Sequence, residues 1–309
     1  MSAPSPPTGT DASRQSSLLP DELPDPAVLA AAAAQQGSDG HYDELHGRLN
    51  APGAPRVALA PLWRQFFDAS GTQGWQDLPT RAQRVQRRVQ EDGATYNVYS
   101  EGKDSAREWP LELLPVLLGA EEWAGIEAGV AQRARLLNAA LADVYGDRTL
   151  LDEGLLPPSL VLGHPQYLRP LHGVKPRGGV HLHIAAFELT RGPDGGWWVL
   201  GQRTQAPSGL GYLLENRLII AQQFPEAFRD LRVQRVAASF QTLLQGLLRL
   251  SPAGERSRVV LLTPGPHNET YFEQVFLARY LGLTLVEGSD LTVRNNRLYL
   301  KTLHGLERV

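Results

Sequence analysis

Two charged side chains flank a predicted β-hairpin, and residues of their types can hold a metal ion or a phosphate group. Glu188 ends an otherwise apolar strand face beside a tight turn. An ionised carboxylate close to a core needs a metal ion or a guanidinium as its partner; the alternative is a solvated strand end. Arg203 follows the second strand and would supply a guanidinium, or a fixed positive charge for phosphate. Glu188 and Arg203 are therefore the candidate catalytic residues, and Glu188 is the candidate metal ligand.

A second group of candidates lies where backbone or basic side chains could bind an anion. The helix predicted after Arg203 opens at Ser208 and Gly209, and the first N–H groups of a helix have no partner within it. Ser208, Gly209 and Arg203 are thus candidate phosphate contacts. Upstream, Lys175 and Arg177 belong to a glycine-containing basic loop that leads into the first strand and could serve the same purpose.

A third candidate segment joins a predicted strand to a predicted helix near the C-terminus. Its sequence is Thr263-Pro264-Gly265-Pro266, and Asn268 is expected to cap the helix that follows. Open α/β sheets bind ligands at the carboxyl ends of their strands, so Thr263, Gly265 and Asn268 are candidate cofactor contacts. A plain structural turn is the alternative.

Other kinds of catalytic site find little support in the sequence. His181 and His183 would share one strand face and could bind zinc, but no third ligand is near them. The chain has no cysteine, which excludes disulfides, thiolate nucleophiles and cysteine-ligated zinc. Ser208 lacks the context of a nucleophile elbow, and neither a P-loop lysine motif nor GxGxxG occurs.

The elements that must position these residues begin with the hairpin. From Val180 the apolar residues alternate with a period of two, which predicts a strand through Thr190. Residues 192–196 (GPDGG) are a strong turn signal, and residues 197–200 return as the second strand. The candidates Glu188 and Arg203 therefore lie on neighbouring strands.

Helical periodicity covers much of the remaining chain. An amphipathic helix is predicted over residues 120–145, and its apolar stripe from Trp123 to Val144 is assigned to the core. Glu215, Asn216 and Arg217 lie inside the helix after Gly209 and either line a cleft or form its polar face. Further helices are predicted over residues 25–36, over 62–90 in two segments, and over about 210–224 and 226–250, with a strand over 94–100.

The last sixty residues predict a different arrangement. Residues 258–263, 269–280 and 283–287 read as strand, helix and strand, a βαβ unit with parallel strands and a right-handed crossover. A hairpin across Asn295-Asn296 follows. Because so few strands cannot form an α/β sheet covered on both faces, we expect the protein to continue beyond Val309.

The fold class is therefore mixed α/β (α+β), in four parts. We expect a disordered tail rich in Pro, Ser and Thr over residues 1–24, a mainly helical region over 25–150, a hairpin-and-helix lobe over 151–254, and a partial βαβ segment over 255–309.

Composition restricts the partners and the compartment. The 309 residues carry a net charge of −3, which gives no overall attraction to nucleic acid or to a membrane surface. No apolar run approaches the roughly 18 residues that suggest a membrane span, and the N-terminus lacks the features of a secretory signal. We expect a cytoplasmic protein.

Several long motifs, in a fixed order, closely resemble one family. They are WPLELLP (109–115), LNAALADVYG (137–146), LRPLHG (168–173), APSGLGYLLENR (206–217), LLTPGPHNETYFEQVFLARYLG (261–282) and VEGSDLTV (286–293). With the hairpin, they resemble the circularly permuted ATP-grasp type 2 family over about residues 80–309. The resemblance implies an ATP-grasp-like lobe over 151–254 and a Rossmann-like, pre-ATP-grasp-like segment over 255–309. Family members are about twice as long or more, and some are fused to an alpha-E domain, so a C-terminal remainder and such a domain are expected partners.

The resemblance also implies a chemistry. ATP-grasp enzymes form an acyl phosphate from a carboxylate and ATP, and an amine or thiol then displaces the phosphate. ATP and Mg²⁺ are thus the implied cofactors, and Mg²⁺ prefers hard oxygen ligands. The family's usual sequence motif, VLEDNLRxPSG, has Glu, Asp and Asn where this chain has Gly201, Gln202 and Arg203. Only Glu188 matches an acidic position, so the resemblance implies a degenerate metal site.

An arginine in place of a coordinating asparagine repels a divalent ion. The hypothesis is that Arg203 occupies the metal's place and pairs with Glu188, or grips a phosphate directly. Two functions stay open. The first is the N-terminal part of an ATP-dependent carboxylate–amine (peptide-type) ligase, inactive as this chain alone. The second is a non-catalytic scaffold that binds a nucleotide or a peptide.

Overall fold

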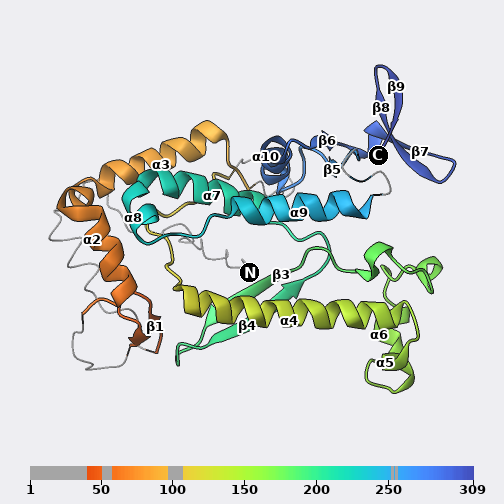
Figure 1. The fold of residues 1–309 in the computed structure, drawn as a ribbon, viewed down its shortest axis with the longest axis horizontal. Helices are drawn as coiled ribbons and strands as arrows, with labels where there is room; N and C mark the ends of the chain where they lie inside the picture. Colours follow the sequence, from red (N-terminus) through yellow and green to blue (C-terminus); the bar gives the residue numbers. More distant parts are fainter. Residues whose placement is uncertain (1–39, 51–57, 97–106, 252–253, 255–256) are drawn as a thin grey trace, which may run out of the picture.

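The computed structural model describes residues 40–50, 58–96, 107–251, 254 and 257–309. In Figure 1 these residues form an elongated arrangement of helices with small two- and three-stranded sheets. The tail predicted over residues 1–24 and the helix predicted over 25–36 lie outside the described residues. Of the strand predicted over 94–100, the described part forms a single antiparallel bridge between Thr95 and Glu108.

The largest hydrophobic core lies where four helices meet. Aromatic side chains dominate it, with Phe66 and Phe224 in contact at a ring-centroid distance of 5.0 Å. The sequence places the break between the two predicted segments of residues 62–90 at Gly71–Gly74, and the structure has a kink at Gly71, whose φ is +62°. The four helices are α2 (Pro61–Gln76), α3 (Leu78–Asp92), α7 (Leu210–Gln223) and α8 (Pro225–Asp230).

The long helix α4 (Ala120–Val144) confirms the prediction over residues 120–145, but its apolar stripe is only partly core. Ile126 and Val144 are buried, whereas Trp123 is 43% exposed. Little of the described chain packs along the middle of α4, and its main neighbour is the short helix α5 (Thr149–Asp152). The assignment of Trp123 to the core was therefore wrong.

The predicted hairpin is present, in a shorter form. Strands β3 (Ala186–Arg191) and β4 (Trp197–Arg203) pair antiparallel across the predicted turn. The prediction that the first strand starts at Val180 was wrong. The backbone N–H groups of His181 and Leu182 donate instead to the side-chain oxygen of Asn138 on α4, at 2.8 and 3.0 Å. The strand therefore begins only where β4 can pair with it.

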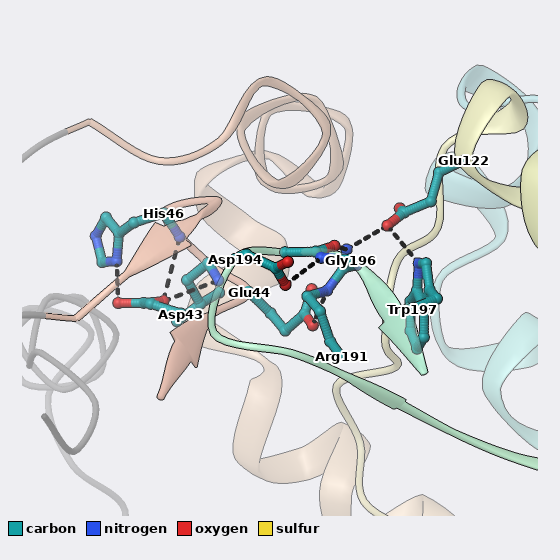
Figure 2. A network of polar contacts seen from close by, with 10 residues as sticks. Asp43, Glu44, His46, Glu122, Arg191, Asp194, Gly196 and Trp197 are labelled. Carbon is teal, nitrogen blue, oxygen red and sulfur yellow. Dashed lines mark hydrogen bonds and ion pairs between the residues drawn. The ribbon is translucent and has the colours of Figure 1, made fainter. Parts of the chain in front are cut away.

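A largely buried arginine holds the turn end of the hairpin, as Figure 2 shows. Arg191 on β3 pairs with Glu122 of α4 and with Glu44, 2.6 Å from its Nε. Its guanidinium also lies over the rings of Tyr42 and Trp197, at 4.7 and 4.4 Å. Although burial alone would raise it, hydrogen bonds from Arg191 and from the indole of Trp197 lower the pKa of Glu122.

The predicted βαβ unit is present, and its two strands run parallel as predicted. Strand β5 (Val260–Leu262) pairs parallel with β6 (Thr284–Val286), and α10 (Tyr271–Leu281) connects them. The hairpin across Asn295 and Asn296 is also found, with both asparagines at positive φ. Its strands β7 (Leu291–Arg294) and β8 (Arg297–Thr302) form a sheet with β9 (Gly305–Arg308).

The prediction of a single helix over residues 226–250 was wrong. α8 ends at Asp230 and α9 (Ala237–Leu250) begins seven residues later, because Arg232 adopts a left-handed backbone with φ of +52°. α9 packs through Phe240 against Leu214 of α7 and Phe276 of α10, which form a second core cluster. The predicted boundaries of the four parts stay predictions.

Short elements complete the described chain, and no helix in it is long and apolar enough to cross a membrane. They are β1 (Tyr42–Asp43), β2 (Arg48–Leu49), α6 (Pro158–Leu162), and the 3-10 turns η1 (Arg169–Leu171), η2 (Arg177–Gly179) and η4 (Gly288–Asp290).

We predict that Arg191→Ala lowers the free energy of unfolding by about 3 kcal/mol, because it leaves two partly buried carboxylates without their cation. Arg229→Ala is the matched control. Its pair with Asp230 is exposed, so its loss should leave the free energy of unfolding nearly unchanged. Urea denaturation of both variants measures the difference, and equal losses would contradict the role given to Arg191.

Candidate functional site

The N-terminus of α7 holds a buried carboxylate. Glu273 of α10 accepts hydrogen bonds from the backbone N–H groups of Gly209 and Gly211, at 2.7 and 3.1 Å. Glu273 is only 4% exposed. Burial raises its pKa, while the bonds from the N–H groups act in the opposite direction by favouring the ionised form. A phosphate could bind these N–H groups only by displacing Glu273.

Helices α7 and α10 lie very close together at Gly211. A Cβ atom at this position would lie 2.5 Å from the Cβ of Glu273 and 2.7 Å from its carbonyl oxygen. Real atoms do not come so close, and part of the obstruction is backbone that cannot rotate away. Only glycine therefore permits the contact that brings Glu273 to the helix start.

We predict that Gly211→Ala lowers the free energy of unfolding by roughly 2 kcal/mol, through overpacking between α7 and α10. The same substitution at Gly246 of α9 is the control. A Cβ there meets nothing within 4 Å, so Gly246→Ala should stabilise the protein by about 0.5–1 kcal/mol. Thermal and chemical denaturation measure both effects, and a neutral Gly211→Ala would contradict the close approach.

The two candidate catalytic side chains meet. Nη2 of Arg203 lies 2.6 Å from Oε1 of Glu188, as the pairing hypothesis predicted. The setting differs from the prediction, since the Glu188 side chain is 53% exposed and so does not lie against a core. A solvated pair of this kind contributes little to stability. Its main effect is that each side chain neutralises the charge of the other.

The hairpin is built to let this pair form. The register shifts between Glu188 and Leu189, and Gly201 stands opposite Glu188. A Cβ at Gly201 would lie 2.9 Å from Oε2 of Glu188. The glycine therefore leaves room for the carboxylate to cross β4 toward Arg203.

A magnesium ion does not fit this donor set. Glu188 already has a guanidinium partner at 2.6 Å, Gly201 offers no side-chain ligand, and Arg203 carries a positive charge. Across the described residues, no group of three or more His, Cys, Asp or Glu side chains could hold a metal ion. The role of Glu188 as a metal ligand stays a prediction that this geometry disfavours.

An open cleft of about 380 Å³ lies at the start of α7. The ring of Trp109 stacks on Tyr212 at a centroid distance of 4.1 Å, and its indole N–H donates to Asn216 Oδ1 at 2.8 Å. Burial and the Glu269 carboxylate raise the pKa of Tyr96, and Arg203 is near enough to oppose them. The cleft is lined by Tyr96, Trp109, Ser208, Gly209, Tyr212, Leu213, Asn216 and Thr270.

The segment after β5 forms a self-contained turn. The Thr263 hydroxyl donates to Gln274 and accepts from the N–H of Gly265, whose φ is +102°. Oδ1 of Asn268 accepts from the N–H and hydroxyl of Thr270. Asn268 does not cap α10, which starts at Tyr271, so that expectation was wrong. Whether Thr263, Gly265 and Asn268 also contact a ligand stays a prediction.

The remaining candidates lie apart from the cleft. Lys175 and Arg177 are exposed on the loop before β3 and do not line it. His181 and His183 precede β3 and do not share a strand face, which corrects the zinc hypothesis, and His181 stacks on Tyr145 at 6.3 Å. The role of Lys175 and Arg177 in binding phosphate stays a prediction.

The three polar residues inside α7 have different surroundings. Asn216 lines the cleft, and the guanidinium of Arg217 lies over the ring of Phe228 at 5.5 Å. Glu215 is 2% exposed, and its Oε1 has no hydrogen-bond partner in the described structure. It borders a second cavity of about 190 Å³, lined by Arg88, Asp92, Glu215, Leu218, Ile219, Gln222, Phe276, Arg279 and Tyr280.

Burial, together with the neighbouring Asp92 carboxyl, raises the pKa of Glu215 to about 7. The folded state therefore holds a proton that the unfolded chain releases near its ordinary pKa of 4.5. This contribution to stability is complete below that pKa and is lost as the pH rises through about 7.

We predict that Glu215→Gln reduces the fall in unfolding free energy between pH 5 and pH 8 by up to about 3 kcal/mol, since glutamine cannot ionise. Urea denaturation at both values measures it. Glu127→Gln, on the exposed side of α4, should follow the unmodified protein. Identical pH dependence in the Glu215 variant and the unmodified protein would show that this carboxyl does not titrate there.

Several residues of the site were missed from the sequence, among them Glu273, Trp109 and Tyr212. Glu273 looked like an ordinary first-turn residue of a helix, and its contact with Gly209 spans 64 positions. Trp109 and Tyr212 belong to recognised motifs, but nothing local indicates that their rings stack. The paired glycines around Leu210 were the available signal, because a glycine inside a helix often marks a close approach.

The fold and the site together define a mixed α+β protein, in which a two-stranded hairpin and a parallel βαβ unit flank a cleft at a helix start. Its sequence fits one family. The pattern of the circularly permuted ATP-grasp type 2 family matches residues 115–309, and the chain belongs to that family. The resemblance drawn from its motifs is confirmed.

Relatives extend the similarity toward the N-terminus. An uncharacterized protein of Synechocystis sp. is 37% identical over 269 residues, which cover 87% of this chain and 54% of that protein. Uncharacterized proteins of Mycobacterium bovis and Mycobacterium leprae are each 36% identical, over 81% and 75% of this chain. The chain spans about half the length, or less, of these relatives, at 54%, 29% and 41%.

Proposed function

We propose that the whole protein is an ATP-dependent carboxylate–amine ligase, and that this chain supplies a substrate cleft. In such a reaction a carboxylate oxygen attacks the γ-phosphorus of ATP, which gives an acyl phosphate and ADP. The amine nitrogen then attacks the acyl carbon, and the C–O bond to phosphate breaks as the amide forms. Membership of the ATP-grasp family supports this reaction class.

The observation that carries the proposal is the position of the cleft. It lies at the start of α7, directly after the strand that ends at Arg203. Its walls are pre-formed, because Trp109 is held by Asn216, and the Tyr212 hydroxyl donates to the carbonyl of Thr95 at 2.6 Å. A concave, mostly apolar site with a few placed polar groups is what a small organic substrate requires.

The proposal assigns no metal step to this chain. Glu188 and Arg203 neutralise each other, and Glu273 occupies the N–H groups that could hold a phosphate. If the whole protein binds ATP with magnesium, we expect the ligands to come mainly from outside these residues.

A non-catalytic scaffold is the second candidate, and one observation favours it. The carboxylate at the acidic position of the family's hairpin is paired with an arginine rather than left open for a metal ion. A protein that binds a nucleotide or a peptide without turnover would need no more than the cleft.

We predict that the whole protein consumes ATP only when a carboxylate and an amine are both present. The measurement is ADP and phosphate release across a panel of carboxylates, amines and peptides, with and without magnesium. ATP binding without turnover in any combination would favour the scaffold and contradict the ligase.

A companion variant tests the charge pair. Arg203→Ala frees Glu188, and we expect it to change the affinity for ATP with magnesium by about tenfold, roughly 1.4 kcal/mol. Calorimetry on the whole protein measures it, with Arg229→Ala as a control for loss of a surface arginine. Tight magnesium-dependent binding that Arg203→Ala leaves unchanged would contradict the role given to this pair.

A further inference from the structure

The cleft at the start of α7 has aromatic walls. The stacked pair of Trp109 and Tyr212 forms one side, and Tyr96 and Leu213 also line it. Faces of aromatic rings carry negative partial charge and attract cations, most strongly for tryptophan and tyrosine. Methylene groups pack favourably on the same surfaces.

The positive groups around the cleft are already neutralised. Arg203 pairs with Glu188, and the N–H groups of Gly209 and Gly211 bind Glu273. No lysine or arginine side chain lines the cleft. An anionic ligand would therefore find no free charge in the described lining.

A negative charge is left without an ion-pair partner in the described chain. Glu269 is exposed at the edge of the cleft, directly before the lining residue Thr270, and its side chain is hydrogen-bonded to that of Tyr96. Burial, with Glu273, Tyr96 and Glu269, raises the pKa of Tyr212 to about 12, and burial with Glu269 raises that of Tyr96. Burial is the larger cause of both shifts, and the Glu269 carboxylate adds to each.

We infer that this cleft binds the ammonium group of an alkylamine, held by Glu269 and by the faces of Tyr96 and Trp109. The inference rests on the proposed function and makes this ligand its amine substrate. The apolar walls suit a methylene chain next to the ammonium. The absence of a cationic side chain from the described lining disfavours a carboxylate on the neighbouring carbon, so a diamine or a lysine side chain fits better than a free α-amino group.

The test uses cadaverine as the probe, without ATP, and titration calorimetry as the measurement. We expect saturable binding at least about tenfold tighter than that of the neutral diol of the same length, and no binding of glutarate. Affinity should fall with added salt, because the attraction is partly ionic.

Two variants locate the site. Glu269→Gln should weaken cadaverine binding by about tenfold, and Tyr96→Leu by about fivefold. Neither side chain is buried, so the melting temperature should stay unchanged. Glu226→Gln, at an exposed carboxylate on α8, is the matched control and should bind cadaverine like the unmodified protein.

The outcomes separate this inference from the proposed function. Equal affinity for diamine and diol, preference for glutarate, or unchanged binding by Glu269→Gln would overturn the amine site. Specific cadaverine binding without ATP consumption in any panel would support the amine site while contradicting the ligase. ATP consumption with amines, combined with an amine affinity that Glu269→Gln leaves unchanged, would support the ligase and contradict the amine site.

Discussion

The carboxylate of Glu273 at the start of α7 is the interaction on which the site depends. It satisfies backbone N–H groups that would otherwise be buried without partners, and it ties α10, and so the βαβ unit, to the helix that lines the cleft. An ionised group so far from water is costly unless several donors converge on it. Gly211 makes that convergence possible by letting the two helices nearly touch.

At the positions where an ATP-grasp protein is expected to hold its ligands, the charged groups of this chain are paired with one another. Arg203 neutralises Glu188, Gly201 makes room for the pair, and Glu273 fills the helix start. Glu269, next to the lining residue Thr270, is then a carboxylate with no ion-pair partner among the described residues. Such a site favours a cation, and under the proposed function that cation is the amine substrate.

The turn end of the hairpin, away from the Glu188–Arg203 pair, has a structural role. Arg191 joins β3 to α4 and to the β1 turn through Glu122 and Glu44, as Figure 2 shows. Its guanidinium also lies over the rings of Tyr42 and Trp197. α7 has a similar division of faces. Tyr212 and Asn216 border the cleft, while Glu215 and Leu218 border the second cavity.

The sequence by itself determined the local elements and the family. Periodicity found α4, the GPDGG turn fixed the hairpin, and two consecutive asparagines fixed the β7–β8 turn, because each of these depends on residues close in the chain. The long ordered motifs identified the family for the same reason. Even the Glu188–Arg203 pair followed from their places on adjacent strands.

Only the tertiary structure decided what the site can bind. Asn138 binds the backbone before β3 from 43 positions away, so that the strand begins later than predicted, and Glu273 reaches Gly209 across 64 positions. Trp109 met Tyr212 only because the fold placed a distant loop against α7. Such contacts depend on how helices pack, and periodicity carries no information about packing partners. The sign of the charge left in the cleft therefore could not be read before the partners of Glu188, Arg203 and Glu273 were known.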